Sequence, residues 1–237
     1  MHRGSHHLNL WVQGKFDSGV PGSLTVLLRF FFLINTFVLM KKRQRRELRD
    51  SLRYLRRNLP FSDQQSASNA VYDFIIRQDF FLSATHLAFY ISFDGELNPK
   101  KILQEAITQR KSCYLPMTSN SGADRLNFGL YDQETTLKEN KWGIEEPLPQ
   151  GSLISPLKLE VVFVPLVGFD DKCSRLGMGK GLYDKTFNFK RRNSLTQPLL
   201  VGLAHECQHV QEIPAENWDV KLDLIVTGER IYRSSHA

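Results

Sequence analysis

The sequence lacks paired cysteines and a long uninterrupted apolar run. Only three cysteines occur in 237 residues (Cys113, Cys173 and Cys207), and no two of them form a C-x-x-C pair. This usage argues against a disulfide framework and is typical of a protein in a reducing compartment, so we expect a cytoplasmic location. The apolar stretch at residues 24–40 is interrupted by Arg29, Asn35 and Thr36. It is therefore marginal for a spanning helix, which needs about 20 apolar residues.

The first 39 residues do not continue the pattern of the rest. Residues 1–23 show no periodicity and are typical of a disordered segment. The apolar stretch that follows lies too far from the N-terminus for a signal peptide and lacks a small-residue cleavage site. We therefore expect residues 1–39 to be a disordered or artificial extension, and the folded domain to occupy residues 40–237. A membrane anchor is the alternative interpretation.

Positive charge is concentrated in one segment. Lys41–Arg57 holds nine basic and two acidic residues, a net charge of +7, whereas the whole chain carries +6. Leucines at positions 48, 52, 55 and 59 predict a helix with one apolar stripe, ended by Pro60. A basic helix is compatible with nucleic-acid binding, but aromatic residues do not alternate with the charges, and such runs are more often solvated faces.

Strand and helix patterns alternate through the rest of the chain. Helical patterns follow Pro60, Asn98 and Gly181. Strands are predicted at residues 85–92, 112–116, 126–131, 160–165, 199–204 and 222–227. This order predicts one α/β domain with three layers, α/β/α, around a largely parallel sheet.

The most informative stretch is Val161–Asp184. A run of Val, Phe and Leu without alternation predicts a strand buried on both faces. Glycines then stand at alternate positions 177, 179 and 181, directly before a helical pattern. Such a loop at a helix N-terminus suits phosphate, because glycines allow close backbone approach and unpaired N–H groups point at the anion. A plain tight turn is the structural alternative.

Two common phosphate motifs are excluded. A P-loop needs Ser or Thr after its Gly-Lys pair, but Gly181 follows Lys180. The dinucleotide motif G-x-G-x-x-G needs a glycine at position 182, where leucine stands. The remaining pattern is G-F-D, four residues, R-L-G-x-G-x-G and L-Y-D. From about Met40 to Tyr232 the sequence resembles the 5-formyltetrahydrofolate cyclo-ligase family, also called 5,10-methenyltetrahydrofolate synthetases.

The resemblance implies ATP-dependent cyclisation of 5-formyltetrahydrofolate to 5,10-methenyltetrahydrofolate, with release of ADP and phosphate through a phosphorylated formyl intermediate. It assigns phosphate binding to cations of the first helix, Lys41 and Arg45, and to the glycine loop. The ATP-binding residues so implied are Lys41, Arg45, Arg175, Gly177, Gly179, Lys180, Gly181 and Tyr183. Arg175 and Lys180 are the implied catalytic cations.

Folate and metal contacts follow from the same resemblance. The implied folate contacts are Ile91, Glu96, Trp142, Met178 and Leu182. Glu96 follows the carboxyl end of a predicted strand, which is where α/β folds bind ligands. The alternative is that Glu96 is a turn residue without a binding role. Its carboxylate suits adjacent pterin N–H donors.

Asp184 and Asp219 are the implied Mg²⁺ ligands, with Asp223 as the alternative to Asp219. The implied partners are ATP and 5-formyltetrahydrofolate, with or without a polyglutamate tail. Neither nucleic acid nor membrane is expected as a partner, and a monomer is expected.

Three positions depart from the family pattern. Cys173 replaces a glycine that usually stands two residues before R-L-G, so it is strained if that position needs a left-handed backbone. Met178 and Leu182 replace the Arg and the aromatic residue of many relatives. These two changes weaken the case for side-chain contacts to folate at both positions.

The string His205-Glu206-Cys207-Gln208-His209 matches the H-E-x-x-H signature of zinc proteases. The signature works on a helix, where histidines at i and i+4 share one face. Here it follows a β pattern, Pro214 limits any helix, and the extended form with a third histidine is absent. We interpret the string as a strand end with a polar turn, and keep a zinc hydrolase as the alternative enzyme.

A chain that begins at Met40 is expected to be soluble and as active as the full chain, because the pattern of residues 1–39 does not join the α/β domain. Circular dichroism and turnover of 5-formyltetrahydrofolate, measured on both chains, check this. Misfolding or inactivity of the shorter chain alone would assign residues 1–39 to the fold.

Overall fold

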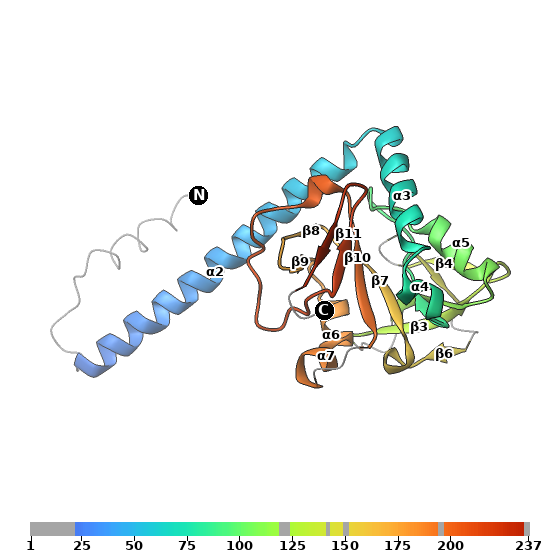
Figure 1. Cartoon of the computed structure of the whole chain (residues 1–237). Coiled ribbons are helices and arrows are strands. Elements are labelled where there is room, and N and C mark those ends of the chain that lie inside the picture. Colours follow the sequence, from blue (N-terminus) through green and yellow to red (C-terminus); the bar gives the residue numbers. More distant parts are fainter. Residues whose placement is uncertain (1–21, 119–123, 141–142, 149–151, 194–196, 235–237) are drawn as a thin grey trace. The chain divides into compact units, whose positions relative to one another are not determined.

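The structure is a computed structural model, and its contacts divide the chain into two compact units, Met1–Arg43 and Gln44–Ala237. It describes residues 22–118, 124–140, 143–148, 152–193 and 197–234 (Figure 1). The boundary falls inside helix α2 (Gly22–Arg57). It lies four residues beyond the expected domain start at Met40.

Helix α2 begins earlier than the sequence predicts. The pattern predicted helix from Lys41, and residues 22–40 are helical as well. That residues 1–39 are a disordered or artificial extension of the domain stays a prediction. No proline or glycine lies between residues 23 and 57, so nothing in the sequence ends the helix at Lys41. The expectation for residues 1–21 falls outside the described residues. Within the described part of the chain, no helix has the length and apolar character needed to cross a membrane.

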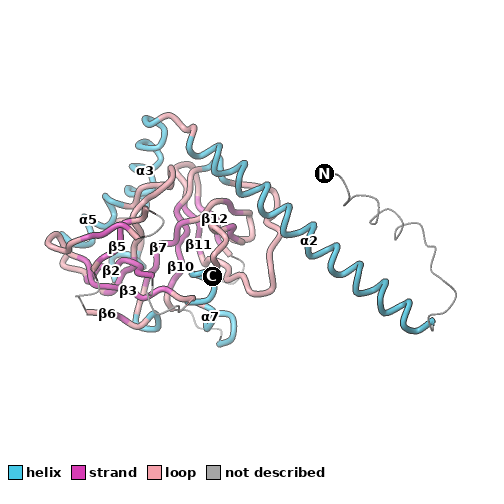
Figure 2. Tube along the Cα trace, turned by 180° about the vertical axis from the view of Figure 1, so that it is seen from behind, coloured by secondary structure: helices cyan, strands magenta, loops and turns pink. Residues whose placement is uncertain are grey.

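The second unit is built on one eight-stranded sheet (Figures 1 and 2). Its order is β12 (Ile231–Arg233), β11 (Leu224–Val226), β10 (Leu199–Leu203), β7 (Val161–Pro165), β1 (His86–Ala88), β2 (Ser112–Thr118), β3 (Leu126–Tyr131) and β6 (Leu153–Ile154). The five strands from β11 to β2 are parallel, and the pairs at both edges are antiparallel. The predicted largely parallel sheet is confirmed.

Strand β7 is buried on both faces, as its unbroken apolar run predicts. Val161 and Phe163 belong to one core cluster, and Val162 and Val164 belong to the other. Its neighbours in the sheet are β1 and β10. The carboxyl end of β7 therefore has a fixed position, and the chain leaves it toward the glycine loop.

Helices cover both faces of the sheet. Helices α3 (Phe61–Ile75), α4 (Asp79–Ser83) and α5 (Lys100–Thr108) supply residues to the first core cluster. Helices α6 (Leu182–Thr186) and α7 (Asn188–Asn193) pack against the second cluster. Figure 2 shows α3 and α5 together on one side of the sheet, away from α7. The single three-layer α/β domain is thus confirmed.

The part of α2 in the second unit packs through the predicted leucine stripe except at Leu55, since Leu52 is buried and Leu48 and Leu59 are half-buried. Leu52 is 3% exposed, whereas Leu55 is 48% exposed. A β-carbon on Gly168 would lie 2.3 Å from Leu52 Cδ1, so the helix packs this closely only over a glycine. Arg56 is fully buried on the same side of the helix. The stripe was wrong only at Leu55, where the buried position is taken by its neighbour Arg56, a residue type that sequence patterns assign to the solvent.

Candidate active site

A short hairpin separates β7 from the glycine loop. Strands β8 (Gly168–Phe169) and β9 (Arg175–Leu176) pair antiparallel, where the sequence predicted a direct strand-to-loop connection. The buried Asp170 carboxylate holds the hairpin turn, accepting from Ser174 N at 2.9 Å through Oδ1. Its Oδ2 accepts from Ile213 N at 3.0 Å. The loop at residues 177–181 therefore begins at a hairpin that is held in place by the hydrogen bonds of Asp170.

Backbone geometry explains the glycines of the loop. Gly179 and Gly181 have φ of 99° and 65°, where a β-carbon is unfavourable. A β-carbon on Gly177 would lie 3.0 Å from Arg175 Nη1. Cys173 also has a positive φ, 56°, so the strain anticipated at this position is present. Its thiol is buried, and burial raises the pKa of Cys173 to about 11.

Asp184, in the first turn of α6, is joined to Arg175. Asp184 Oδ1 lies 2.9 Å from Arg175 Nη2, and the two side chains are 14% and 5% exposed. The same oxygen accepts from Val220 N at 3.0 Å. The Arg175 guanidinium also lies 5.5 Å from the centre of the Tyr183 ring. The loop, α6 and the segment around residue 220 are thus tied together.

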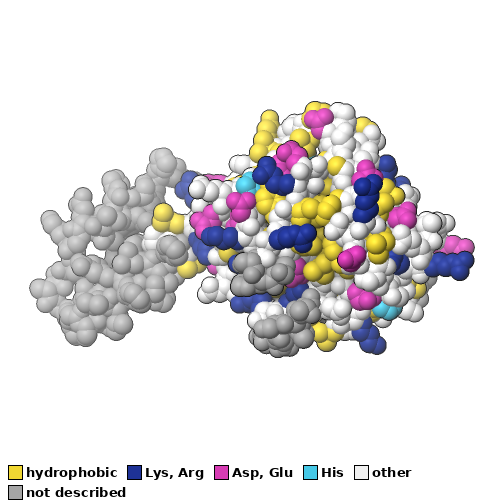
Figure 3. Space-filling view, viewed as in Figure 1, with side chains coloured by type: hydrophobic (Ala, Val, Ile, Leu, Met, Phe, Trp, Pro, Cys, Tyr) yellow, Lys and Arg dark blue, Asp and Glu magenta, His cyan; other side chains and the backbone are white. Residues whose placement is uncertain are grey.

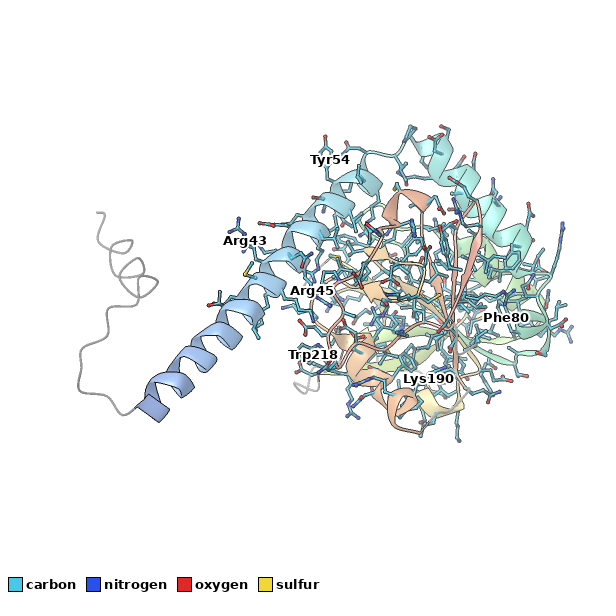
Figure 4. The ribbon with its side chains drawn as sticks, turned by 60° about the vertical axis from the view of Figure 1, so that its left-hand side comes forward. Arg43, Arg45, Tyr54, Phe80, Lys190 and Trp218 are labelled. Atoms are coloured by element: carbon cyan, nitrogen blue, oxygen red, sulfur yellow. The ribbon has the colours of Figure 1, made fainter. Side chains whose placement is uncertain are left out.

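Asp219 forms a second arginine pair beside the first. Arg45 Nη1 lies 2.7 Å from Asp219 Oδ2 and 2.7 Å from the carbonyl oxygen of Pro214. Figure 4 shows Arg45 extending from α2 toward the segment that carries Trp218. Because Val220 N bonds to Asp184, the two predicted metal carboxylates lie on adjoining segments. Each of them already has an arginine partner that was predicted to bind phosphate.

Asp223, the alternative metal ligand, has another role. Its Oδ2 lies 2.7 Å from Lys190 Nζ and 2.7 Å from the backbone nitrogen of Leu200. Leu200 lies at the start of β10, at the opposite end of the sheet from the glycine loop. The geometry therefore favours Asp219 over Asp223.

Arg49 belongs to this cluster, although the sequence analysis did not single it out. Its Nε donates to the carbonyl oxygen of Gly177 at 2.8 Å. A β-carbon on Gly179 would lie 3.6 Å from its guanidinium carbon. The available signal was its spacing: Arg49 lies four residues after Arg45, and so on the same helix face.

Glu96 lies in the turn after β1, and its side chain is 11% exposed. Its Oε2 accepts from Phe93 N at 3.2 Å, and its Oε1 lies 3.6 Å from Arg56 Nη2. Burial raises the pKa of Glu96 to about 7, although the Arg56 charge opposes this shift. Burial raises the pKa of Tyr183 too, and the charge of Glu96 adds to that shift. The predicted folate carboxylate is thus electrostatically coupled to the helix after the glycine loop.

The remaining predicted residues have varied positions. Met178 and Lys180 are exposed on the loop, whereas Ile91 and Leu182 are half-buried. Lys41 belongs to the first unit, so its contact with ATP stays a prediction. Trp142 lies outside the described residues.

The H-E-x-x-H string has structural partners. Residues Glu206–Gln208 form a single 3-10 turn, η2, so the two histidines do not share an α-helical face. Glu206 accepts from Tyr232 Oη at 2.5 Å and from Thr227 Oγ1 at 2.7 Å. His209 Nε2 lies 2.9 Å from Asp171 Oδ1.

Among the described residues, no three His, Cys, Asp or Glu side chains are grouped as a metal site. The 3-10 turn supports the interpretation of the string as a strand end with a polar turn.

The arginines of the basic helix bind acceptors within the domain. Arg45, Arg49, Arg53 and Arg56 donate to Asp219, Gly177 O, Asp94 and Leu166 O, among other acceptors. On the face shown in Figure 3, basic and acidic side chains are interspersed. The hydrogen bonds of these four arginines give the basic segment Lys41–Arg57 a structural role within the domain.

A largely parallel sheet with a glycine loop, arginines and carboxylates beyond the carboxyl end of its central strand is the arrangement of those α/β proteins that bind ligands at that edge. The sequence profile of the 5-formyltetrahydrofolate cyclo-ligase family matches residues 41–228. The chain belongs to this family.

Individual relatives agree with the profile. A 5-formyltetrahydrofolate cyclo-ligase of Haemophilus influenzae is 37% identical over 190 residues, covering 80% of this chain and 100% of that protein. The Escherichia coli K12 protein of the same name is 37% identical over 147 residues, covering 62% of this chain and 79% of that protein.

The solved structures agree as well. The Aquifex aeolicus 5,10-methenyltetrahydrofolate synthetase superposes with a TM-score of 0.69 at 26% identity, covering 81% of this chain and 93% of that one. The Mycoplasma pneumoniae 5,10-methenyltetrahydrofolate synthetase, at 19% identity and a TM-score of 0.61, covers 78% of this chain and 98% of that one, and supports the fold alone.

Protonation of His205 should contribute a loss of stability in acid. Its ring is 2% exposed and its Nε2 has no hydrogen-bond partner. Burial, and then the Arg56 charge, lower the pKa of His205 to about 4. The unfolded chain therefore binds the proton first, so this contribution is complete above about pH 6.5 and is lost as the pH falls toward 4. Between pH 7.5 and 5 this contribution should fall by up to about 2 kcal/mol, while Glu96, whose raised pKa gives a contribution of opposite sign, offsets it in the total.

Urea unfolding at both pH values, on the wild type, His205→Asn and His209→Asn, checks this. Comparing the pH-dependent change within each protein removes the pH-independent cost of each substitution. The change in stability between the two pH values should differ by up to about 2 kcal/mol between His205→Asn and the wild type, the variant being the less sensitive to acid, and the control His209→Asn should match the wild type. Equal pH-dependent changes in all three proteins would contradict the assignment to His205.

Proposed function

We propose that the protein couples ATP hydrolysis to the cyclisation of 5-formyltetrahydrofolate, producing 5,10-methenyltetrahydrofolate, ADP and phosphate. The observation that carries the proposal is the pairing of Arg45 with Asp219 and of Arg175 with Asp184 around the glycine loop of a family member. Arginines suit phosphate, and carboxylates suit a magnesium ion that accompanies it.

The chemistry needs activation of a poor leaving group. The formamide oxygen of the substrate attacks the γ-phosphate of ATP, giving an iminium phosphate and ADP. N10 of the folate then attacks the formyl carbon, the N10 proton is lost, and phosphate leaves to give the cyclic product. The protein positions the reactants and neutralises charge rather than forming a covalent bond to either.

The donor set fits Mg²⁺. Carboxylate oxygens are hard donors, and Mg²⁺ commonly takes one or two of them together with phosphate oxygens and water. Asp184 Oδ2 faces the loop, 3.9 Å from where a β-carbon on Gly181 would lie. When bound, the ion would neutralise phosphate charge. Asp184 and Asp219 would hold it, while Arg45 and Arg175 would turn from these carboxylates toward phosphate oxygens.

The backbone of Gly177, Gly179 and Gly181, with Lys180 and Tyr183, completes the proposed ATP subsite, and Arg49 supports it from α2. Folate would lie beside Ile91 and Glu96, the carboxylate accepting from pterin N–H groups. Contacts to folate from Trp142, Met178 and Leu182 remain part of the proposal. We further infer a cytoplasmic monomer that acts on small molecules rather than on nucleic acid or membrane.

Turnover should require both ATP and Mg²⁺, and Asp184→Asn should reduce kcat by roughly 100-fold or more, since losing one charge-stabilising group has effects on that scale. Steady-state kinetics with a magnesium titration measure this. Asp124→Asn is the control. Asp124 is an exposed carboxylate that pairs with Lys185, the residue after Asp184 in α6, and its replacement should leave kcat near the wild-type value.

His209→Ala should also retain most of the activity. Cyclisation that survives Asp184→Asn would refute the metal site while leaving the function in place. Stoichiometric zinc, or peptide hydrolysis abolished by His209→Ala, would replace the proposed function with the hydrolase.

Glu96→Gln should weaken folate binding by about 1.5–3 kcal/mol, the range for hydrogen bonds that involve a charged group, because the amide keeps the size but not the charge. ATP binding should change little. Titration calorimetry with each ligand measures both affinities, and unaltered folate affinity would remove Glu96 from the site.

A further inference from the structure

Arg56 is a fully buried charge at the end of α2, with an exposed fraction of 0%. Its Nε donates to the carbonyl oxygen of Asp94 at 2.9 Å, and its Nη2 donates to Asp94 Oδ2 at 2.9 Å. Its Nη1 donates to the carbonyl oxygen of Leu166 at 3.0 Å. A buried arginine is stable only when its donors are matched in this way. The guanidinium therefore has one orientation.

This orientation joins two parts of the proposed folate and nucleotide sites. Leu166 directly follows β7 and leads to the hairpin that supports the glycine loop. Asp94 lies in the turn that carries Glu96, and Asp94 and Gly95 have φ of 58° and 75°. Because Asp94 adopts a left-handed backbone despite its β-carbon, the turn depends on outside contacts to keep this shape.

Glu96 Oε1 lies 3.6 Å from Arg56 Nη2. The other charged or titratable groups near this carboxyl are Arg53 on α2, Asp94 in the same turn, Tyr90 after β1 and Tyr183 on α6. Arg56 is the strongest influence that favours the charged form of Glu96, against burial, which disfavours it. With the pKa of Glu96 at about 7, loss of the Arg56 charge would change its protonation state near neutral pH.

We propose that Arg56 is a positioning residue, which fixes the Glu96 turn against the end of β7 and keeps the carboxylate ionised for folate binding. The inference rests on the proposed folate role of Glu96. Arg56 itself does not touch the substrate. Folate binding should therefore weaken in mild acid, as Glu96 takes up a proton. Arg56 sets the pH at which this weakening occurs.

A matched control comes from the same helix. Arg57 also pairs with Asp94, but its side chain is 51% exposed, and its charge is not among the main influences on Glu96. Arg57→Gln therefore removes one arginine and one contact to the turn without removing the neighbour of Glu96. Arg56→Gln removes the charge, and Arg56→Lys keeps the charge but loses the planar set of donors.

The experiment measures KM for 5-formyltetrahydrofolate and for ATP between pH 6 and 9 in wild type, Arg56→Gln, Arg56→Lys, Arg57→Gln and Glu96→Gln. In wild type and Arg57→Gln, folate KM should rise below about pH 7. In Arg56→Gln the midpoint should move up by about 1–3 pH units, the effect of losing an opposite charge at this separation. This variant should regain part of its affinity toward pH 9 but keep a folate KM above that of the wild type, because it also loses the donors that fix the turn, with ATP KM unchanged. Arg56→Lys should keep the wild-type midpoint but show a higher folate KM at every pH.

Circular dichroism establishes folding of each variant. If Arg56→Gln does not fold, Arg56→Lys decides the proposal, because wild-type folate KM at every pH would overturn the positioning role. An unshifted midpoint in folded Arg56→Gln would overturn the ionisation role. Glu96→Gln should bind folate weakly and without pH dependence over this range. Wild-type folate binding by Glu96→Gln would instead refute the proposed folate site, independently of Arg56.

Discussion

The burial of β7 on both faces is the constraint on which the rest of the structure depends. Its side chains enter both core clusters, so the strand cannot shift without disturbing two layers of helices. Its carboxyl end is therefore a fixed point. From it the chain passes through Leu166 and a two-stranded hairpin to the glycine loop, and the Leu166 carbonyl accepts from both Arg56 and Gln208. Core packing thus determines where the loop can lie.

Charge in the candidate site is arranged as matched pairs. Arg45 with Asp219 and Arg175 with Asp184 are mostly buried, at 2.7 and 2.9 Å, so each charge compensates another that would be costly to bury alone. A ligand that brings both an anion and a cation can exchange partners with these pairs at little net change of charge. A metal-free anion would leave two carboxylates without compensation. We infer that the arrangement favours nucleotide and metal binding together.

The sequence predicted those features that follow from pattern and local geometry. The unbroken run in β7, the alternation of strands with helices and the glycine loop before α6 all lie where expected. The concern about Cys173 was justified, because its backbone is left-handed. Features that depend on tertiary contacts were missed. Strands β8 and β9 have two residues each, too few for a periodicity signal.

Two further errors of the sequence analysis concern arginine. Patterns assign this residue to the solvent, yet Arg56 is fully buried, while Leu55 beside it is 48% exposed. The same bias hid Arg49, whose importance depends on a carbonyl oxygen 128 residues away in the chain. For the candidate residues that the structure describes, the family resemblance predicted which side chains bind phosphate, folate or metal. Only the structure showed that the predicted phosphate and metal ligands pair with one another.

The spacing of arginines in α2, between Arg45 and Arg56, decides which part of the candidate site each arginine reaches. Its arginines at 45, 49, 53 and 56 recur at intervals of four, four and three, which keeps them near one face over roughly 16 Å. The first two reach the carboxylate and loop of the proposed nucleotide side, and the last two reach the turn that carries Glu96. Inserting one residue between Arg49 and Arg53 would rotate one pair by about 100° relative to the other. A change of length between these residues should therefore displace two arginines together, whereas a substitution removes the contacts of one.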